Sequence, residues 1–450
     1  MLFASLVGLS CCDTKQPDVE ASAAAKASAA NKPDVKPTAA PAPDPATATI
    51  TPPKPIAITP AKADVERAVA RSINAFGVDY YKRTSAGDSN IVLSPASISL
   101  AFAMTYAGAR GETADEMKRT FHYDLVGDDL YAGFGTTLAR WNASKDIQLS
   151  VANRLFGEVT FDFAPPFVAL TERYFGAGLQ TMDFKDGADS SRSQINAWVE
   201  DQTQTRIKDL LPTGSITPIT RLVLANAVYF KADWKAPFEK KNTREATFRA
   251  PGGDVQVPMM RRSEMLASVP HYSDAKLSIV ELPYKGSTMS MLLVLPAADD
   301  GLAALESSLT PEILDDWAKK VRLASVTVKI PVFRIAPPSS ISLKKTLQSM
   351  GLVRAFKGDQ AQFDGMAADP AHNPLFISDA FHKAFIEVNE KGTEAAAATA
   401  VVMGRGAGAP QVPENEFVAD HPFLYLLRDT STGAVLFMGR VNDPSADAAK

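Results

Sequence analysis

Cysteine is almost absent from this 450-residue chain, which has only two, Cys11 and Cys12, side by side near its start. Residues 13–450 therefore contain no disulfide, no thiol nucleophile and no cysteine-ligated metal. For that part of the chain, this excludes small disulfide-bonded scaffolds, cysteine hydrolases and cysteine-based zinc modules.

An excess of positive charge is also missing, because 47 Lys and Arg stand against 51 Asp and Glu, a formal net charge of −4. Without a net positive field, the chain lacks the overall electrostatic footprint of a nucleic-acid-binding protein, and only a local basic patch would remain for such a partner. The composition, 22% charged and 46% hydrophobic, is that of a soluble protein long enough to bury a sizeable core. We expect no nucleic-acid partner.

The sequence motifs of several enzyme classes do not occur. The five histidines include no pair four residues apart, as in HExxH, and neither GxSxG nor GxxxxGK[ST] is found. The glycine-rich run 404–408 does not open a helical pattern, so we interpret it as a loop rather than a phosphate cradle. Because no clustered acid/base set stands out, we predict that the chain is not an enzyme and binds no metal or cofactor.

The first residues form a short apolar run, 1–10, directly before Cys11 and Cys12. The run is too short to span a bilayer but suits the apolar part of a signal peptide, and residues 1–12 resemble a bacterial lipoprotein signal. The resemblance is incomplete, because no Lys or Arg precedes the run and Leu9 stands three residues before Cys12 rather than Cys11. We expect an exported protein, periplasmic, cell-surface or extracellular, that is lipidated on one of these cysteines; a cleaved secretory signal is the alternative.

Residues 13–63 contain ten prolines, many alanines and no aromatic residue. Such a segment buries too little apolar surface to offset the entropy lost on ordering the chain. We predict a disordered linker that holds the following domain away from the surface to which the protein would be anchored.

Residues 64–445 are predicted to form one large α+β domain. Apolar residues at helical spacing, such as Val69 and Ile73, predict helices in its first part. Later segments read as strands, among them 221–230, 289–295, 326–330 and 434–438. The strands follow one another too irregularly for a doubly wound parallel sheet.

The most informative segment is 390–399, in which four consecutive alanines follow Gly392 and Thr393. One interpretation is a helix followed by a Gly/Pro-rich loop. However, the run from Thr393 has no bulky residue before Val401, which leaves little apolar surface to hold a helix on a core. The other interpretation is a strand that enters between two paired strands, because small side chains do not obstruct a narrow gap. By period two, Thr393 and every second residue after it would share one face of that strand.

Residues 390–399 resemble the reactive-loop hinge of the serpins. Five segments in all resemble serpin segments and follow one another in serpin order: 90–113, 195–212, 222–238, 377–400 and 419–441. The resemblance covers residues 64 to 443. It implies the serpin fold, with three β-sheets, eight or nine helices and an exposed reactive loop.

The resemblance also implies a function, which is inhibition of serine proteases by a suicide mechanism. The protease cleaves the loop, forms an acyl ester, and is trapped when the cleaved loop inserts into the central sheet. The partner would then be a serine protease held in a covalent complex with a monomeric inhibitor. The alternative is a non-inhibitory serpin that acts as a chaperone, storage or binding protein. The absence of proline, of charge at Thr393 and of bulky residues after it favours the inhibitor.

Three groups of residues match functional positions of the family. The hinge comprises Glu390, Gly392, Thr393, Glu394, Ala395, Ala396, Ala397, Ala398 and Thr399. The shutter, which holds the central sheet closed, comprises Ser94, Ser97, Asn226 and His382. Trp234 matches the aromatic residue at the breach, where the loop first enters the sheet; nearby, Ala232 stands where the family usually has glycine.

The resemblance also implies a position for the scissile bond. Serpins commonly have seventeen residues from the hinge glutamate through the residue before the bond, which from Glu390 gives Gly406, whereas a sixteen-residue loop gives Arg405. A guanidinium would suit the acidic pocket of a trypsin-like protease, so we favour the bond between Arg405 and Gly406. Cleavage after Met403, Gly406 or Ala407 would indicate elastase-like or subtilisin-like targets, and cysteine proteases are a further alternative.

Overall fold

Val69 and Ile73, whose helical spacing predicted a helix, lie in helix α1 (Ala63–Thr84), where both side chains are fully buried. The protein is described here by a computed structural model, which describes residues 50, 54, 56, 58–176, 178–371, 374–393 and 415–447. All of them belong to one compact unit, Pro45–Lys450.

Helices dominate the first half of the domain, as predicted. The described residues contain nine α-helices: α1, α2 (Pro95–Tyr106), α3 (Gly111–Thr120), α4 (Gly127–Asn142), α5 (Pro165–Phe175), α6 (Ala188–Gln202), α7 (Leu302–Ser307), α8 (Pro311–Lys320) and α9 (Lys344–Ser349). Two short 3-10 turns, Lys240–Asn242 and Arg354–Phe356, complete them.

The central sheet is seven-stranded, in the order β10-β12-β13-β4-β2-β3, with β11 paired to β12. Its strands are β2 (Ile147–Glu158), β3 (Gln180–Met182), β4 (Leu222–Asp233), β10 (Phe333–Ile335), β11 (Ile341–Ser342), β12 (Asp379–Val388) and β13 (Gly392–Thr393). The segment 221–230, predicted as a strand, is the middle of this sheet.

The second sheet is nine-stranded, in the order β1-β16-β15-β8-β7-β6-β9-β14, with β5 paired to β6. Its strands are β1 (Ile91–Leu93), β5 (Arg244–Ala250), β6 (Gly253–Ser273), β7 (Leu277–Pro283), β8 (Met289–Pro296), β9 (Arg322–Pro331), β14 (Asn415–Val418), β15 (Phe423–Asp429) and β16 (Val435–Val441). The serpin resemblance implies three sheets, and two of them are joined in this nine-stranded sheet. The 21-residue strand β6 joins them, because it pairs with β5 and β9 along most of its length and with β7 at its end.

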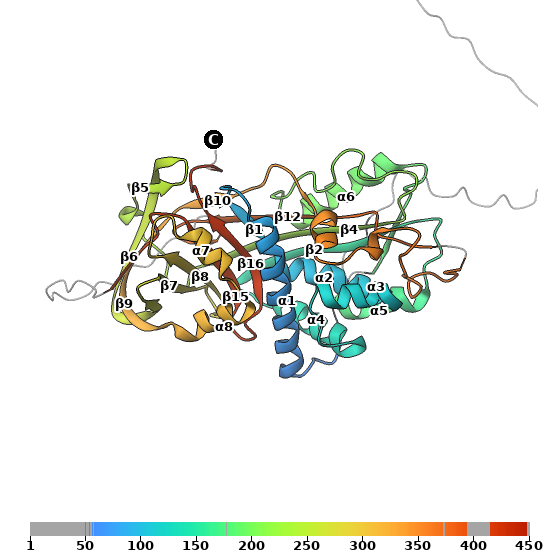
Figure 1. The fold of residues 1–450 in the computed structure, drawn as a ribbon, viewed down its shortest axis with the longest axis horizontal. Coiled ribbons are helices and arrows are strands. Elements are labelled where there is room, and N and C mark those ends of the chain that lie inside the picture. The colour runs from blue at the N-terminus through green and yellow to red at the C-terminus, as the bar shows by residue number, and fades with distance from the viewer. Residues whose placement is uncertain are drawn as a thin grey trace, which may run out of the picture. The chain divides into compact units, whose positions relative to one another are not determined.

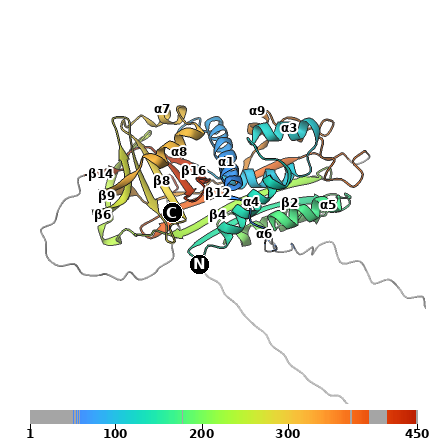
Figure 2. The same ribbon diagram turned by 90° about the horizontal axis from the view of Figure 1, so that it is seen from below.

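Strand β4 is covered on both faces, as its nearly unbroken apolar sequence requires. Alternate side chains, such as Val223 and Tyr229, pack with α6 in one apolar cluster, whereas Leu224 and Phe230 pack in the main core. Figure 1 shows α6 above the long strands, and α2 and α4 below them. The same strands run past α5 and α6 in Figure 2. Asn226, a polar residue in the middle of this strand, is therefore buried.

The chain before α1 already contacts the domain. Within the linker expected over 13–63, the described residues Lys54, Ile56 and 58–62 lie against α4 and α5. The side chains of Ile56 and Ile58 pack against the main core. Cys11, Cys12 and the rest of residues 1–49 lie outside the described residues. Among the residues that are described, no helix has the length and apolar character needed to cross a bilayer.

Candidate functional site

The central sheet contains a fork between its two middle strands. Strands β12 and β4 pair directly in parallel, from Asp379 opposite Val223 to Phe385 opposite Tyr229. Beyond that point they diverge, and β13 lies between them, antiparallel to both. The first residues of the predicted hinge thus already occupy the opening of the fork.

Gly392 is required by the narrowness of this opening. A Cβ at this position would lie 2.1 Å from the carbonyl oxygen of Ala232, a distance that no side chain tolerates. A tight turn leads into it, because the Asn389 N–H donates to the carbonyl of Gly392 at 2.9 Å. Any other residue would push the hinge out of the fork.

Thr393 is fully buried, opposite Val388 on one side and Ala232 on the other. Its hydroxyl lies 2.6 Å from the hydroxyl of Tyr284. Burial raises the pKa of Tyr284 above its ordinary value, so the phenol stays protonated and can donate or accept in this pair. The site therefore accepts an uncharged residue of threonine size.

Trp234 lies beside the hinge, where the sequence placed the breach. Its indole Nε1 donates to the carbonyl of Asn389 at 3.0 Å, and its backbone N–H donates to the carbonyl of Lys391 at 2.7 Å. The ring stacks on Tyr284, with 4.5 Å between centroids and 13° between planes. The role of Tyr284 was not predicted from the sequence, because this residue follows a strand and belongs to no periodic pattern or motif.

Glu390, at the base of the hinge, is held by two contacts from the segment that follows β4. The Thr243 hydroxyl donates to its carboxylate at 2.8 Å, and the Phe238 N–H donates to its carbonyl at 2.8 Å. Glu390 is thus fixed in position at the base of the hinge.

The four predicted shutter residues meet below the fork, although they come from α2, β4 and β12. Ser94 is the N-cap of α2, where its hydroxyl accepts from the Ser97 N–H at 3.2 Å and donates to the Leu436 carbonyl at 2.6 Å. Asn226 donates to the Ser97 hydroxyl at 2.8 Å. All four are at most 2% exposed, so each needs its partners.

A fifth member, Asn153 on β2, was not found from the sequence. Its Oδ1 accepts from the Ser97 hydroxyl at 3.0 Å and from the Asn226 amide at 2.7 Å, and its own amide donates to the Ser97 carbonyl at 2.8 Å. The strand around it also contains Gln148, Ser150 and Arg154, so no local pattern distinguished this asparagine. The cluster therefore connects α2 with three strands of the sheet.

His382 connects the two strands of the parallel seam. Its Nδ1 contacts the Asn226 amide oxygen, and its Nε2 accepts from the Ser94 N–H at 3.3 Å. One neighbour is an acceptor and the other a donor, so the pair fits the neutral imidazole with its proton on Nδ1. Burial lowers the pKa of His382 from 6.5 to about 3.

The remaining predicted residues cannot be placed. Glu394, Ala395 to Thr399, Arg405 and Gly406 lie outside the described residues, as do Cys11 and Cys12. Over the part of the chain that the structure describes, no group of three or more His, Cys, Asp or Glu residues is positioned to hold a metal ion.

Comparison with known proteins identifies the family. A sequence model described as Serpin (serine protease inhibitor) matches residues 71–444. The chain belongs to the serpin family. Curated relatives include leukocyte elastase inhibitor A of Rattus norvegicus, 37% identical over 83% of this chain and 98% of the relative, and antithrombin-III of Mus musculus, 37% identical over 84% and 82%.

Solved structures agree with the serpin fold predicted from the sequence, which is confirmed. Uncleaved ovalbumin superimposes with a TM-score of 0.74 at 29% identity, covering 84% of this chain and 100% of that chain. The thermophilic serpin tengpin in its native state gives 0.76 at 26% identity, covering 87% and 97%. Human thyroxine-binding globulin complexed with thyroxine gives 0.74 at 28% identity, covering 84% and 99%.

We expect His382 to make this serpin acid-sensitive. The pKa of His382 in the folded chain lies below its unfolded value of 6.5. As the pH falls below 6.5, the unfolded chain therefore binds a proton while the folded chain does not, and unfolding is favoured. The free energy of unfolding should therefore decrease as the pH falls from 6.5 toward 3, by on the order of 1 kcal/mol per pH unit from this residue alone. His382→Gln keeps one donor and one acceptor without titrating, so its thermal midpoint should fall less than that of the wild type between pH 7 and 5.

Ser97→Ala, which weakens the same cluster without removing a titratable group, is the matched control, and its thermal midpoint should fall with pH as that of the wild type does. Equal decreases for wild type and His382→Gln, at one scan rate and ionic strength, would contradict this assignment.

Proposed function

We propose that this serpin inhibits serine proteases as a suicide substrate. The protease serine attacks a carbonyl in the loop 394–414, an acyl ester forms, and the amine side of the cleaved bond leaves with a proton. The freed strand then enters the fork and carries the attached protease with it. The proposal rests on one observation above all: Gly392 and Thr393 already pair antiparallel with both β12 and β4.

The register of these two residues specifies where further insertion would lead. If pairing continues, Ala395 comes between Ile386 and Phe230, and Thr399 comes between His382 and Asn226. The side chains on this face point into the main core, which explains why the hinge carries alanine there. Thr399 would have to separate His382 from Asn226, so the polar cluster is proposed to gate insertion.

Insertion would replace one parallel seam by two antiparallel ladders. Parallel pairing is slightly less stable per residue, and each inserted residue adds main-chain hydrogen bonds on both sides. This supplies a driving force that the uncleaved chain has not yet used.

A non-inhibitory binding protein is the second candidate. One structural neighbour is a thyroxine-binding globulin in complex with thyroxine, so the fold by itself does not decide the function. The small hinge residues and the fully buried, uncharged Thr393 favour inhibition.

The target is proposed to be trypsin-like on the strength of Arg405. The relatives named above are an elastase inhibitor and an antithrombin, so the family's names point to more than one kind of protease. The loop residue before the scissile bond should decide among them.

The variant Thr393→Arg should be cleaved by the protease without trapping it. Thr393 is wholly buried in the fork, and a guanidinium there would have no partner, which should raise the barrier to insertion by at least about 3 kcal/mol, about 100-fold in rate. Thr393→Val, which loses only the hydroxyl contact, should still form a complex that survives denaturing electrophoresis. If Thr393→Arg traps as well as the wild type, the insertion mechanism is wrong.

Replacing Arg405 by Ala should slow the inhibition of trypsin by at least about 100-fold, because the acidic specificity pocket loses its partner. Met403→Ala, two residues away, should leave trypsin inhibition unchanged. Incubation with trypsin, elastase and subtilisin, with mass spectrometry of the released peptide, identifies the bond. Unchanged trypsin inhibition by Arg405→Ala would transfer the assignment to Met403, Gly406 or Ala407.

We also propose that the protein is exported and lipid-anchored through Cys11 or Cys12. The apolar run before these cysteines supports this proposal. Metabolic labelling with a fatty acid in a bacterial host should label the wild type, and each single alanine variant should reveal which cysteine carries the lipid. Equal labelling of the double variant Cys11→Ala, Cys12→Ala would rule lipidation out.

A further inference from the structure

A cavity of about 530 Å³ lies where separate segments of the chain meet. Most of its wall comes from the loop after α1, the turn that follows β5, the segment that leads into α7, and the end of β16 with the residues after it. A second cavity of about 740 Å³ adjoins it, because Asp88, Ala250 and Pro251 line both. We refer to the two together as the acidic cavity. None of the hinge, breach or shutter residues lines it.

The floor of the acidic cavity is built on Arg440, at the end of β16, which is 2% exposed. Its guanidinium pairs with Glu306 of α7 at 3.0 Å and donates to three carbonyls of the loop 85–89. These bonds fix the loop from which Asp88 lines the cavity. Because Glu306 neutralises the guanidinium, Arg440 does not attract an anion into the cavity.

Arg249, near the end of β5, is the other arginine in the wall, and it is also paired with carboxylates. Its guanidinium lies 2.7 Å from Asp299 and 2.9 Å from Asp420. The positive charges that line the acidic cavity are therefore balanced within the chain, so neither arginine is left for an acidic ligand.

Four aspartates in the wall have no such partner. Asp88 and Asp300 line the smaller cavity, and Asp88, Asp254 and Asp447 line the larger one. None of these carboxylates has an ion pair or a hydrogen bond among the described residues. A hollow lined by unbalanced charge of one sign concentrates ions of the opposite sign. The acidic cavity therefore favours a cation.

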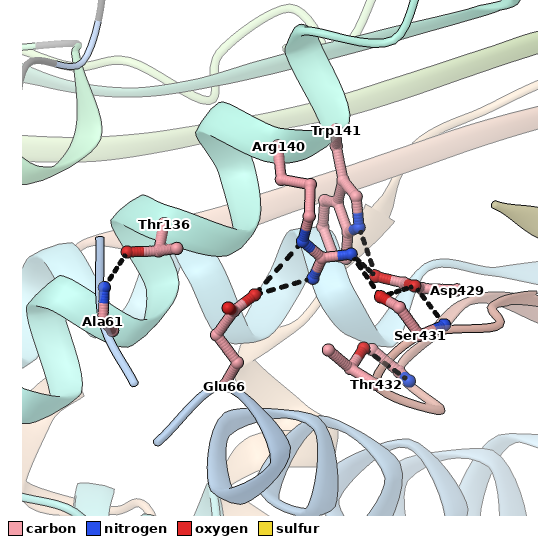
Figure 3. A network of polar contacts seen from close by, with 9 residues as sticks. Ala61, Glu66, Thr136, Arg140, Trp141, Asp429, Ser431 and Thr432 are labelled. Atoms are coloured by element: carbon pink, nitrogen blue, oxygen red, sulfur yellow. Dashed lines mark hydrogen bonds and ion pairs between the residues drawn. The ribbon is translucent and has the colours of Figure 1, made fainter. Parts of the chain in front are cut away.

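The carboxylates of a network elsewhere in the domain provide a contrast. Arg140 of α4 pairs with Glu66 of α1 and with Asp429 of β15 (Figure 3). Asp429 also accepts from the Trp141 indole at 3.0 Å and from the Ser431 hydroxyl at 2.6 Å. Each carboxylate of that network thus has a donor within the chain, whereas the four aspartates of the acidic cavity have none among the described residues.

A buried amide on the floor of the cavity also lacks a donor. Asn442, two residues after Arg440, is 3% exposed and lines the cavity. Its backbone N–H donates to Asn90 at 2.8 Å, but its side-chain Oδ1 has no hydrogen-bond partner among the described residues. Buried amide oxygens in folded proteins are normally paired, because an unpaired one is unfavourable. An N–H group from a ligand would supply this partner.

The unpaired acceptors call for a ligand with several positive charges and several N–H donors. A single metal ion fits less well, because the described residues contain no group of three or more His, Cys, Asp or Glu side chains that could hold one. An ammonium group is a compact charge with up to three donors. A flexible chain with ammonium groups at intervals can reach carboxylates that are spread over both parts of the cavity.

We propose that the acidic cavity binds a linear polyamine, whose ammonium groups pair with Asp88, Asp254 and Asp300 and whose N–H groups reach the amide of Asn442. The bound polyamine joins the loop after α1 to the segment before α7 and to the turn after β5. It therefore stabilises the folded domain, because it binds the folded chain and not the unfolded one. The inference is independent of the proposed function, since the hinge, breach and shutter residues lie outside this cavity.

The test is calorimetric titration of the full chain with spermidine at low ionic strength. We expect one saturable site, and a thermal midpoint that rises with the spermidine concentration. The double variant Asp88→Asn, Asp300→Asn should bind spermidine about tenfold more weakly, because each ion pair near the surface contributes up to about a factor of five. The matched control, Asp124→Asn with Asp129→Asn, removes two exposed carboxylates outside the cavity and should bind as the wild type does.

A second variant, Asp88→Lys, places an ammonium group of the chain itself in the cavity. Its thermal midpoint should no longer respond to spermidine. The proposal is overturned if spermidine does not bind, or if the double variant in the cavity binds as tightly as the matched control. It is also overturned if Mg²⁺ at the same ionic strength raises the midpoint as much as spermidine does, because screening of surface charge would then explain the effect. Neither assay contains a protease, so a failure here leaves the proposed function unaffected.

Discussion

The parallel pairing of β12 with β4 is the interaction on which the rest of this structure depends. It joins the two central strands directly, yet it ends at Phe385 and Tyr229, where the strands diverge around the hinge. In the proposed mechanism, the fork, the hinge in its opening and the polar cluster below act together, and the two strands separate from the fork downwards.

The polar cluster is costly to bury and is stable only because its members satisfy one another. His382 and Asn226 stand on opposite sides of the seam, and Ser97 and Asn153 extend the network to α2 and β2. An apolar seam would resist opening by packing alone. Here, opening must also break directed hydrogen bonds, so the cluster can hold the seam firmly and still release it at a definite point.

The sequence predicts much of this fold, and the limits of the prediction have physical causes. Small side chains and period two identified the hinge, and apolar runs identified β4 and β8. Asn153 and Tyr284 were not predicted, because their roles come from contacts between segments that are distant in the sequence, and no local pattern indicates such contacts. Ile56 and Ile58 escaped because two isoleucines among prolines have no helical or strand period. The depth to which the hinge enters the fork depends on a balance between two pairings, which composition does not express.

The hinge seated in the fork also bears on how copies of this chain interact. A gap between strands attracts any suitable strand, including the loop of a second molecule. Gly392 and Thr393 already fill its opening, and a covalently attached segment acts at an effective concentration in the millimolar range. A loop from another copy at micromolar concentration would have to displace this resident segment first. If the loop inserts as proposed, the position of these two residues favours insertion into the chain's own sheet over insertion into a second copy, so linkage between copies would require a high protein concentration.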